Sequence, residues 1–509
     1  MTSVWRRTAG TGRPYGSDFP PIRVADIVNV HRLLLRQLGI ERLAAVIGGS
    51  FGGMQVLDWA LRYPEMIDRC VCIASALSLS AQALAFDVVG RNSIMSDPAW
   101  QGGHYYAEGR VPAAGLAQAR KLGHITYLSP EIMAAKFGRN RHNRRDARDG
   151  VGDRFRSNFE VERYLDHQGR KFVDRFDANS YLYITAAMDD FDLEDRYGGA
   201  VDAFARIRSK FLVVALSSDW LFPPEQSRTI ASGLIQAGKP VSYCLLQAPH
   251  GHDAFLVDVR HLADALRAFL PWVGPSRTAQ PAGAPRFSRV RAAERKREHC
   301  LIADMVETGA AVLDIGCGSG ELLAMLEERK KVRGIGIDID IGHVIDVLDC
   351  GCDVLQEDVD SGLAMIPDDT YDYAVMCETL QAVHQPRFVL HEMLRVARCG
   401  IVSFPNFGKW SHRAYLGVTG RMPKGGALPY EWYNTPNIHL FSLRDFLELC
   451  DEDGIVVLDS VCLPRGPVDR MLLACGACNA GAERILVKLT TAERAAARGA
   501  PVNRPCRRR

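Results

Sequence analysis

Two strand–glycine–helix patterns constrain how this chain folds. The first is AAVIGGSFGGMQ at residues 44–55, and the second is VLDIGCGSGELL at residues 312–323. A strand that enters a helix through a glycine turn is typical of α/β proteins with parallel sheets. Because 509 residues are too many for an ordinary single domain, we expect two or three domains, with one pattern in each half.

A stretch rich in Pro, Gly, Ala and Arg separates the two patterns. GPSRTAQPAGAPRFSR at residues 274–289 has no apolar periodicity and predicts a linker. We therefore place the first domain at 1–273, with a polar, helical lid at about 111–200. The second domain is expected at 290–490, followed by a tail at 491–509.

The composition excludes several classes of function. A net charge of +2 gives no electrostatic reason for binding nucleic acid or a membrane surface. The start of the chain lacks the apolar core of a secretory signal, and no apolar run of about 18 residues occurs, so we expect a cytoplasmic protein. The 14 cysteines are scattered, and CGAC at residues 475–478 has no second pair at zinc spacing. No metal site is expected.

The serine between the glycine pairs matches the nucleophile-elbow pattern G-x-S-x-G, formed by Gly48, Ser50 and Gly52. In such an elbow the serine occupies a strained turn, and small neighbours are needed because the backbone passes close to itself. The N–H of Phe51 would then face a developing oxyanion. The pentapeptide alone also fits a tight turn or a phosphate loop in which the serine is incidental.

A serine nucleophile needs a histidine base and an orienting carboxylate, and the chain supplies both in the expected order. VVALSSDWLF places Asp219 just after a strand, and LLQAPHGHDAFL places His252 just after the next one. His250 competes with His252 for the role of base. The order Ser, Asp, His is that of the α/β-hydrolases, so we predict a triad of Ser50, Asp219 and His252.

Longer motifs resemble one acyltransferase family. GRPYGSDFPPIRVAD, VIGGSFGGMQ, RFDANSYLYIT, SSDWLFPPEQS and GHDAFL are similar to homoserine O-acetyltransferase, over about residues 11–270. The resemblance implies an α/β-hydrolase fold, an acyl group carried on Ser50, and His252 rather than His250 as the base. It also implies that Arg91 and Asp253 bind L-homoserine. From the residues alone, the alternatives for these two are a surface ion pair and a helix cap.

The same resemblance implies ping-pong chemistry with acetyl-CoA as the acyl donor. Succinyl-using members often carry an arginine two residues after the triad aspartate; Leu221 stands there, which favours acetyl. A homodimer formed through the lid is also implied.

One departure from that family concerns the start of the chain. About a hundred residues that normally precede GRPYGSDFP are missing, including sheet strands and a loop with the second oxyanion donor. A missing donor costs about 10² to 10³ in rate, and missing strands expose a sheet edge. We therefore expect a truncated α/β-hydrolase domain. Two interpretations stay open: a start placed too late, or a degenerate, poorly active domain.

The second glycine pattern predicts a nucleotide-like ligand, although a plain tight turn fits it too. Gly316, Gly318 and Gly320 follow the strand that contains Asp314. A second strand, in VRGIGIDID, ends at Asp338. A carboxylate at this position can accept hydrogen bonds from both ribose hydroxyls. Asp358 ends the third strand. These elements resemble a Rossmann-like class I methyltransferase domain, which implies S-adenosylmethionine as a possible cofactor.

More specific motifs resemble the methionine biosynthesis protein MetW over about residues 294–490. SGLAMIPDDTYDYAVMCETLQAV and MLRVARCGIVSFPNFGKW carry the similarity. Ser319 stands where that family commonly has an aspartate. NTPNIHLFS at residues 434–442 either lines the pocket or forms an ordered surface loop. We find no obvious general base that would deprotonate a methyl acceptor. Methyl transfer often needs only correct positioning of the reactants, so this absence does not decide against it.

Both resemblances imply one pathway, methionine biosynthesis. We expect a homoserine O-acetyltransferase fused to a MetW-like module. Two alternatives stay open: an inert first half that acts as a regulatory or scaffolding partner, and an esterase fused to an active small-molecule methyltransferase.

Overall fold

The computed structural model divides the chain into two compact units, Met1–Ala263 and Asp264–Arg509. It describes residues 12–141, 159–273, 297–425, 428, 431–497 and 507–508. The linker expected at 274–289 lies outside these residues. Two units agree with the two glycine patterns in the sequence.

A four-stranded parallel sheet forms the centre of the first unit. Its strands, in spatial order, are β1 (Leu43–Gly49), β2 (Ile67–Ile73), β3 (Lys210–Leu216) and β4 (Val241–Leu246). β3 is buried along almost its whole length, which explains its unbroken apolar sequence FLVVAL. All four strands run in the same direction, so the loops after them meet at one edge of the sheet.

Helices cover this sheet and connect its strands. They are α1 (Val24–Gln37), α2 (Phe51–Arg62), α8 (Leu193–Tyr197), α9 (Ala200–Phe204), α10 (Pro224–Gln236), α11 (Ala254–Val257) and α12 (Arg260–Phe269), the last of which spans the division between the units. α2 packs against β1 and β2, and α10 packs against β3 and β4.

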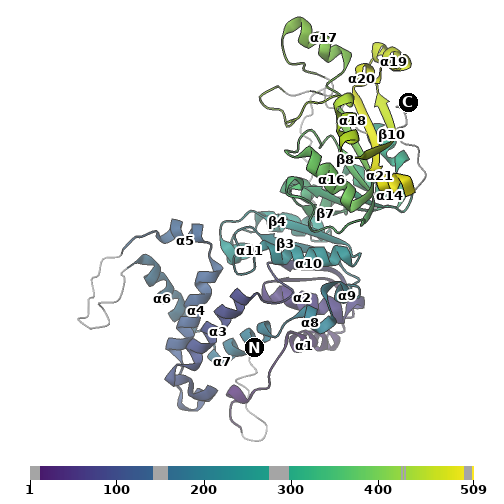
Figure 1. Ribbon diagram of the computed structural model, residues 1–509. Helices are drawn as coiled ribbons and strands as arrows, with labels where there is room; N and C mark the ends of the chain where they lie inside the picture. Colours follow the sequence, from purple (N-terminus) through teal and green to yellow (C-terminus); the bar gives the residue numbers. More distant parts are fainter. Residues whose placement is uncertain are drawn as a thin grey trace. The chain divides into compact units, whose positions relative to one another are not determined.

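The long insertion between β2 and β3 forms a helical lid with a core of its own. Its helices are α3 (Ala81–Met95), α4 (Ala113–Tyr127), α5 (Pro130–Phe137), α6 (Glu160–Val173) and α7 (Ala178–Asp189). They gather beside the sheet rather than on it (Figure 1). The buried side chains of the lid core are Ile94, Tyr105, Leu116, Ala119, Phe172 and Ala178. The lid includes α3 and so begins earlier than the expected residue 111.

In the described part of the chain, β1 lies at one edge of the sheet. Among the described residues, β1 pairs with β2 alone, and Ile47 in this strand is 48% exposed. The neighbouring helix α1 exposes Val30, Leu33 and Leu34.

The second unit contains a larger, mixed sheet. Its strands, in spatial order, are β7 (Asp353–Gln356), β6 (Arg333–Asp338), β5 (Ala311–Ile315), β8 (Tyr371–Cys377), β9 (Ala397–Pro405), β11 (Arg484–Thr491), β10 (Ile455–Leu463) and β12 (Arg507–Arg508). The first five are parallel, and β11 runs antiparallel to both β9 and β10. Because β5 lies in the middle of the parallel part, its carboxyl end and its glycine turn are central.

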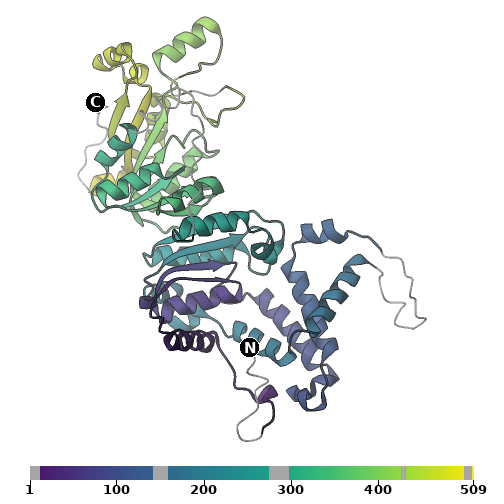
Figure 2. The same ribbon diagram turned by 180° about the vertical axis from the view of Figure 1, so that it is seen from behind.

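Helices flank this second sheet (Figure 2). They are a helical segment at 297–305, α14 (Glu321–Lys330), α15 (Ile341–Asp349), α16 (Pro386–Val396), α17 (Trp410–Thr419), α18 (Leu443–Glu452), α19 (Pro467–Ala474), α20 (Cys478–Gly481) and α21 (Ala492–Ala497). α21 lies within the expected tail, yet it is packed, with Ala495 buried. The CGAC motif caps α19 and opens α20.

No helix in the described part of the chain is both long enough and apolar enough to span a lipid bilayer.

Candidate functional site

Ser50 lies at the sharp turn between β1 and α2. Its backbone angles, φ 55° and ψ −123°, fall in a region that residues other than glycine rarely adopt. Such a conformation costs about 1–3 kcal/mol, so the surrounding structure must hold it. The Ser50 N–H donates to the carbonyl of Ile73 at 2.8 Å, and the Gly53 N–H donates to the Ser50 carbonyl at 2.8 Å. The turn therefore presents the serine at the carboxyl end of β1.

The glycines around Ser50 differ in whether their surroundings leave room for a Cβ atom. A Cβ atom on Gly48 would lie 2.2 Å from the carbonyl oxygen of Gly52, and one on Gly53 would lie 2.4 Å from the Cβ of Ser75. A Cβ on Gly52 itself would meet nothing within 4 Å. Crowding by neighbouring atoms thus requires glycine at positions 48 and 53. Of the two outer glycines of G-x-S-x-G, Gly48 is required for this reason and Gly52 is not.

This difference predicts opposite effects for two alanine substitutions. Gly48→Ala should lower the free energy of unfolding by about 2 kcal/mol or more, because overpacking strains the turn. Gly52→Ala should be neutral or stabilising by up to about 1 kcal/mol, because alanine is the better helix former. Thermal unfolding of the two variants beside the parent measures both effects. Equal losses in the two variants would contradict this account of the turn.

Asp219 and His252 form a buried pair at the same edge of the sheet. Both side chains are almost fully buried, and His252 Nδ1 lies 2.7 Å from Asp219 Oδ2. Asp219 Oδ1 accepts hydrogen bonds from the N–H groups of Leu221 (3.0 Å) and Phe222 (2.9 Å). The carboxylate is therefore held in place by two backbone donors and directed at one imidazole nitrogen. Of the two candidate histidines, His252 is the one that pairs with Asp219.

Aromatic rings fix the orientation of the His252 imidazole. Phe222 stacks on it with ring centroids 5.2 Å apart, and Phe255 meets it edge-on at 5.8 Å. The Phe255 ring also packs against Gly49, where a Cβ would lie 2.8 Å from it. These contacts link the imidazole to the turn that carries Ser50.

Ser50 opens into a cavity of about 290 Å³ beneath the lid. Besides Ser50 and Phe51, its lining includes Leu221 and Phe222 from the loop after β3. The remaining lining residues come from the β2–α3 loop and the lid helices and are Leu79, Ala83, Phe86, Asp87, Arg120, Leu122, Gly123, Thr126, Tyr127, Phe172, Phe176, Tyr181, Ile184, Thr185 and Met188. A largely apolar chamber of this kind can keep water from a covalent acyl intermediate.

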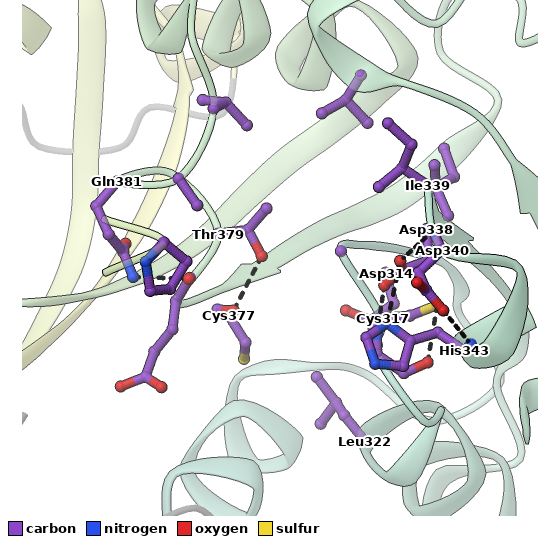
Figure 3. Close-up of a pocket in the computed structure, with 18 of the residues that line it drawn as sticks. Asp314, Cys317, Leu322, Asp338, Ile339, Asp340, His343, Cys377, Thr379 and Gln381 are labelled. Atoms are coloured by element: carbon purple, nitrogen blue, oxygen red, sulfur yellow. Dashed lines mark hydrogen bonds and ion pairs between the residues drawn. The ribbon is translucent and has the colours of Figure 1, made fainter. Parts of the chain in front are cut away.

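A second cavity, of about 680 Å³, lies in the second unit at the carboxyl ends of its parallel strands. Figure 3 shows Asp314, Asp338 and His343 on one side of it and Thr379 and Gln381 on the other. Cavities at this edge of a parallel sheet are the usual ligand sites of α/β folds.

The glycine turn after β5 is held by Asp338. Asp338 Oδ2 accepts a hydrogen bond from the Gly318 N–H at 2.9 Å, and Oδ1 lies 3.2 Å from His343 Nδ1. Gly316 (φ +72°) has no room for a Cβ, which would lie 2.4 Å from Thr379 Oγ1. Gly318 (φ +55°) has open space instead, so a ligand can approach its backbone.

Asp314 is a deeply buried acidic group of this cavity. It is 2% exposed, and its Oδ1 has no hydrogen-bond partner in the described structure. Burial, and then the nearby carboxylate of Asp338, raises the pKa of Asp314 to about 7. An unpartnered buried carboxylate is costly, and a cationic or hydrogen-bond-donating ligand would stabilise it.

Comparison with known proteins supports the division into two parts. The family model described as "alpha/beta hydrolase fold" matches residues 6–259, and "Methionine biosynthesis protein MetW" matches residues 296–475. The "Bifunctional methionine biosynthesis protein MetXA/MetW" of Rhodopirellula baltica is 39% identical over 465 residues, covering 89% of this chain and 72% of that protein. The chain belongs to this bifunctional family.

The first part of this MetXA/MetW-family chain also matches single-function proteins. A "Homoserine O-succinyltransferase" of Methylibium petroleiphilum is 47% identical over 279 residues, covering 55% of this chain and 71% of that protein. A "Homoserine O-acetyltransferase" of Mesorhizobium japonicum is 48% identical over 261 residues, covering 51% of this chain and 66% of that protein. Overall similarity therefore does not separate the two acyl donors.

The structure gives Arg91 a different setting from the one expected for a substrate ligand. Its guanidinium pairs with Asp189 of α7, and it is absent from the described lining of the Ser50 cavity. The arginine that lines this cavity is Arg120, on α4. Asp253 is likewise not among the lining residues; it directly follows His252.

In the second unit, the expected ligand residues fall into two groups. Asp314, Gly316, Gly318, Asp338 and Asp358 all line the larger cavity. Gly320 does not line it but precedes the first residue of α14, in a left-handed conformation. Pro436 and Asn437 of the 434–442 segment also reach the cavity.

Sequence reasoning missed several polar groups of this larger cavity, among them Gln381, Arg484, Glu298 and Glu378. Gln381 is 4% exposed, and its Oε1 has no hydrogen-bond partner in the described part of the chain. Arg484 forms ion pairs with Glu298 (3.1 Å) and Glu378 (2.9 Å) at the wall. Both Glu378 and Gln381 lie in the segment directly after β8, and a position just beyond a parallel strand was the available signal for them.

Proposed function

We propose that the first unit transfers an acetyl group from acetyl-CoA to the hydroxyl of L-homoserine, through an acyl-enzyme on Ser50. The observation that carries this proposal is the buried Asp219–His252 pair beside the strained serine turn, in a chain of the MetXA/MetW family. The second unit would act in the same pathway as a MetW-like module.

In the first half-reaction, His252 takes the proton of the Ser50 hydroxyl, and Oγ attacks the thioester carbonyl carbon. The N–H of Phe51, at the first position of α2, stabilises the oxyanion of the tetrahedral intermediate. The C–S bond then breaks, and the sulfur of CoA leaves with the proton that His252 held. Asp219 keeps the imidazole in the tautomer whose Nε2 is free to accept a proton.

In the second half-reaction, His252 removes the proton of the homoserine hydroxyl. The oxygen attacks the acetyl carbonyl, the bond to Ser50 Oγ breaks, and His252 returns the proton to the serine. Water competes at this step, and the apolar lining of the cavity supports transfer over hydrolysis.

Leu221 supports acetyl rather than succinyl as the transferred group. It lines the cavity beside Phe222, so an apolar side chain meets the acyl group at this position. At this position a succinyl carboxylate would meet an apolar side chain rather than a cation.

The test follows CoA release by the full chain. With acetyl-CoA, release should depend on L-homoserine and should exceed release from succinyl-CoA. Release that is independent of homoserine would instead indicate an esterase or thioesterase. No release from either donor would favour the regulatory or scaffolding alternative.

We further propose that the second unit binds S-adenosylmethionine. The residues fit this molecule, because the open space at Gly318 admits a ligand to the backbone and Asp314 offers a buried, unpartnered carboxylate oxygen to a cation. Asp338 and Asp358 would accept hydrogen bonds from its hydroxyl groups. When bound, S-adenosylmethionine supplies an electrophilic methyl group.

Calorimetry on the full chain should show this binding, and Asp314→Asn should weaken it at least about tenfold, because a charged partner is lost. Since burial raises the pKa of Asp314 to about 7 and a cationic ligand favours its ionised form, affinity should rise from about pH 6 to about pH 8.

The matched control is Asp346→Asn, an exposed carboxylate on α15 outside the cavity. It should leave the affinity unchanged. Equal affinities of the parent and Asp314→Asn would overturn the role of Asp314, and no binding by the parent would overturn the cofactor.

Dimerisation and location in the cell remain proposals. We infer a homodimer formed through the lid, a proposal supported by the exposed apolar side chains Val88, Val89 and Met95 on α3. Light scattering coupled to gel filtration measures the state of association. A cytoplasmic location is consistent with the substrates proposed above.

A further inference from the structure

The larger cavity, in the second unit, has an acidic lining. Among the described residues that line it, most charged side chains are Asp or Glu, and Arg484 is the one Lys or Arg. This arginine is already engaged by two carboxylates, those of Glu298 and Glu378. Burial, and then the carboxylates of Glu298 and Asp314, raise the pKa of the Cys377 thiol in the same lining. The cavity is therefore complementary to a cation.

Gln381 presents an unused hydrogen-bond acceptor to this cavity. It follows β8, is almost fully buried, and lies across the cavity from Asp338 and His343 (Figure 3). Its Nε2 donates to the Glu378 carbonyl at 2.6 Å, so turning the amide over would set two oxygens against each other. Oε1 has no hydrogen-bond partner within the described residues. A ligand that donates a hydrogen bond to this oxygen would remove the cost of burying it.

The backbone holds Gln381 in this position. Its carbonyl accepts hydrogen bonds from the N–H groups of Ile438 (2.7 Å) and His439 (3.0 Å). Glu378, in the same turn, has a left-handed φ of 51°, and its N–H donates to the Ser403 carbonyl at 3.0 Å. Such a strained conformation persists only where the surroundings fix it, so the side chains of this turn are held in place.

Two neighbouring side chains offer further acceptors on the same side of the cavity. The Thr379 hydroxyl donates to the Cys377 carbonyl at 3.0 Å, which leaves its oxygen lone pairs to accept. Among the described residues, Arg484 contacts Oε1 of Glu378 at 2.9 Å, and this side chain is 30% exposed, so Oε2 is left to the cavity. Together with Gln381, the turn offers one carboxylate and two neutral oxygens.

We propose that Glu378, Thr379 and Gln381 bind the ammonium group of a small primary amine. A primary ammonium carries one positive charge and three N–H donors, which match one carboxylate and two neutral oxygens. The amine would share the cavity with the S-adenosylmethionine proposed above, which the glycine turn and Asp314 would receive on the other side. The second unit would then hold two ligands at once.

The experiment compares two cations of equal charge, in titrations of the full chain followed by saturation-transfer NMR. n-Butylammonium has N–H donors and n-butyltrimethylammonium has none. Because both are attracted by the acidic lining, the ratio of their affinities reports the hydrogen bonds. The parent should bind n-butylammonium at least about tenfold more tightly, as expected for charge-assisted hydrogen bonds.

Variants of the turn should lose this preference. In Gln381→Met, which keeps the length of the side chain, and in Glu378→Gln, the ratio should fall to about threefold or less. Asp314→Asn on the cofactor side should keep the parent ratio, as should Glu328→Gln, at an exposed carboxylate on α14 outside the cavity. A parent without preference, an unchanged ratio in either variant of the turn, or a ratio lost in Asp314→Asn would overturn the proposal.

Saturating S-adenosylmethionine separates the two ligands. It should leave the affinity of the parent for n-butylammonium within about twofold. Exclusion of the amine would mean that the turn belongs to the cofactor site, and would overturn the proposal. Because the titrations without S-adenosylmethionine need neither the cofactor nor acyl transfer, failure of the proposed function would not alter them.

Near-ultraviolet circular dichroism reports whether the variants keep their packing. Should Gln381→Met lose it, Thr379→Val takes its place, because valine has the shape of threonine without the hydroxyl oxygen. Its ratio should also fall to about threefold or less, and an unchanged ratio would overturn the proposal.

Discussion

Replacing Ser50 with alanine is expected to abolish homoserine-dependent CoA release, with a loss on the order of 10⁶-fold in kcat. Losses of this size follow removal of the nucleophile in other serine hydrolases, because no other group can carry the acyl chain. The fold should survive, since alanine removes one hydroxyl from a turn that backbone hydrogen bonds to Ile73 and Gly53 hold. Initial rates with acetyl-CoA and L-homoserine measure the loss.

The matched control is Ser93→Ala on α3. The Ser93 hydroxyl donates to the Val89 carbonyl of its own helix at 2.9 Å and is outside the described cavity lining. This variant should keep the parent rate. Residual activity of Ser50→Ala within about tenfold of the parent would show that acyl transfer does not pass through this serine.

Asp219→Asn is the second large effect, with an expected loss on the order of 10⁴-fold in kcat. The oxygen of the new amide would keep the hydrogen bonds from the Leu221 and Phe222 N–H groups. Its NH₂ group would then face His252 Nδ1, and this nitrogen would have to accept a hydrogen bond instead of donating one. The imidazole would carry its proton on Nε2, the wrong tautomer for a base.

Asp219→Asn should lose rate without losing structure, and so the melting temperature serves as a second readout. Asp202→Asn, at an exposed carboxylate on α9, is the control and should change neither quantity. A rate for Asp219→Asn within about tenfold of the parent would mean that the reaction does not need Asp219 to orient the His252 imidazole.

Positions at strand ends could be predicted well from the sequence. Ser50, Asp219 and His252 each follow an apolar run, and parallel strands bring their carboxyl ends to one edge of a sheet. The pairing of Asp219 with His252 follows from that topology. The same reasoning placed Asp314 and Asp338 around one cavity in the second unit.

Contacts between lid helices could not be predicted in this way. Arg91 and Arg120 both lie on helices, and their periodicity does not tell which partner each one reaches. The partner of Arg91 is Asp189, 98 residues further along the chain, and this pairing depends on how α3 packs against α7. Arg120 reaches the cavity because α4 packs against α3 and presents that face.

The roles of individual glycines also needed the structure. The motif G-x-S-x-G treats Gly48 and Gly52 alike, yet only the Cβ of the former would collide with backbone. Likewise Gly316 is crowded by Thr379, which follows another strand, whereas Gly318 faces open space. A spacing pattern shows where the backbone turns. Which glycine of that turn has no room for a Cβ depends on its tertiary neighbours.

The covalent intermediate provides the most direct test of the reaction. The full chain would be mixed with acetyl-CoA in the absence of L-homoserine, quenched in acid, and digested for mass spectrometry. We expect one added acetyl group on the peptide that contains Ser50, and we expect it to be removed when L-homoserine is supplied before the quench. An unmodified Ser50 peptide in a chain that still turns over, or an acetyl group on another residue that homoserine discharges, would contradict this expectation.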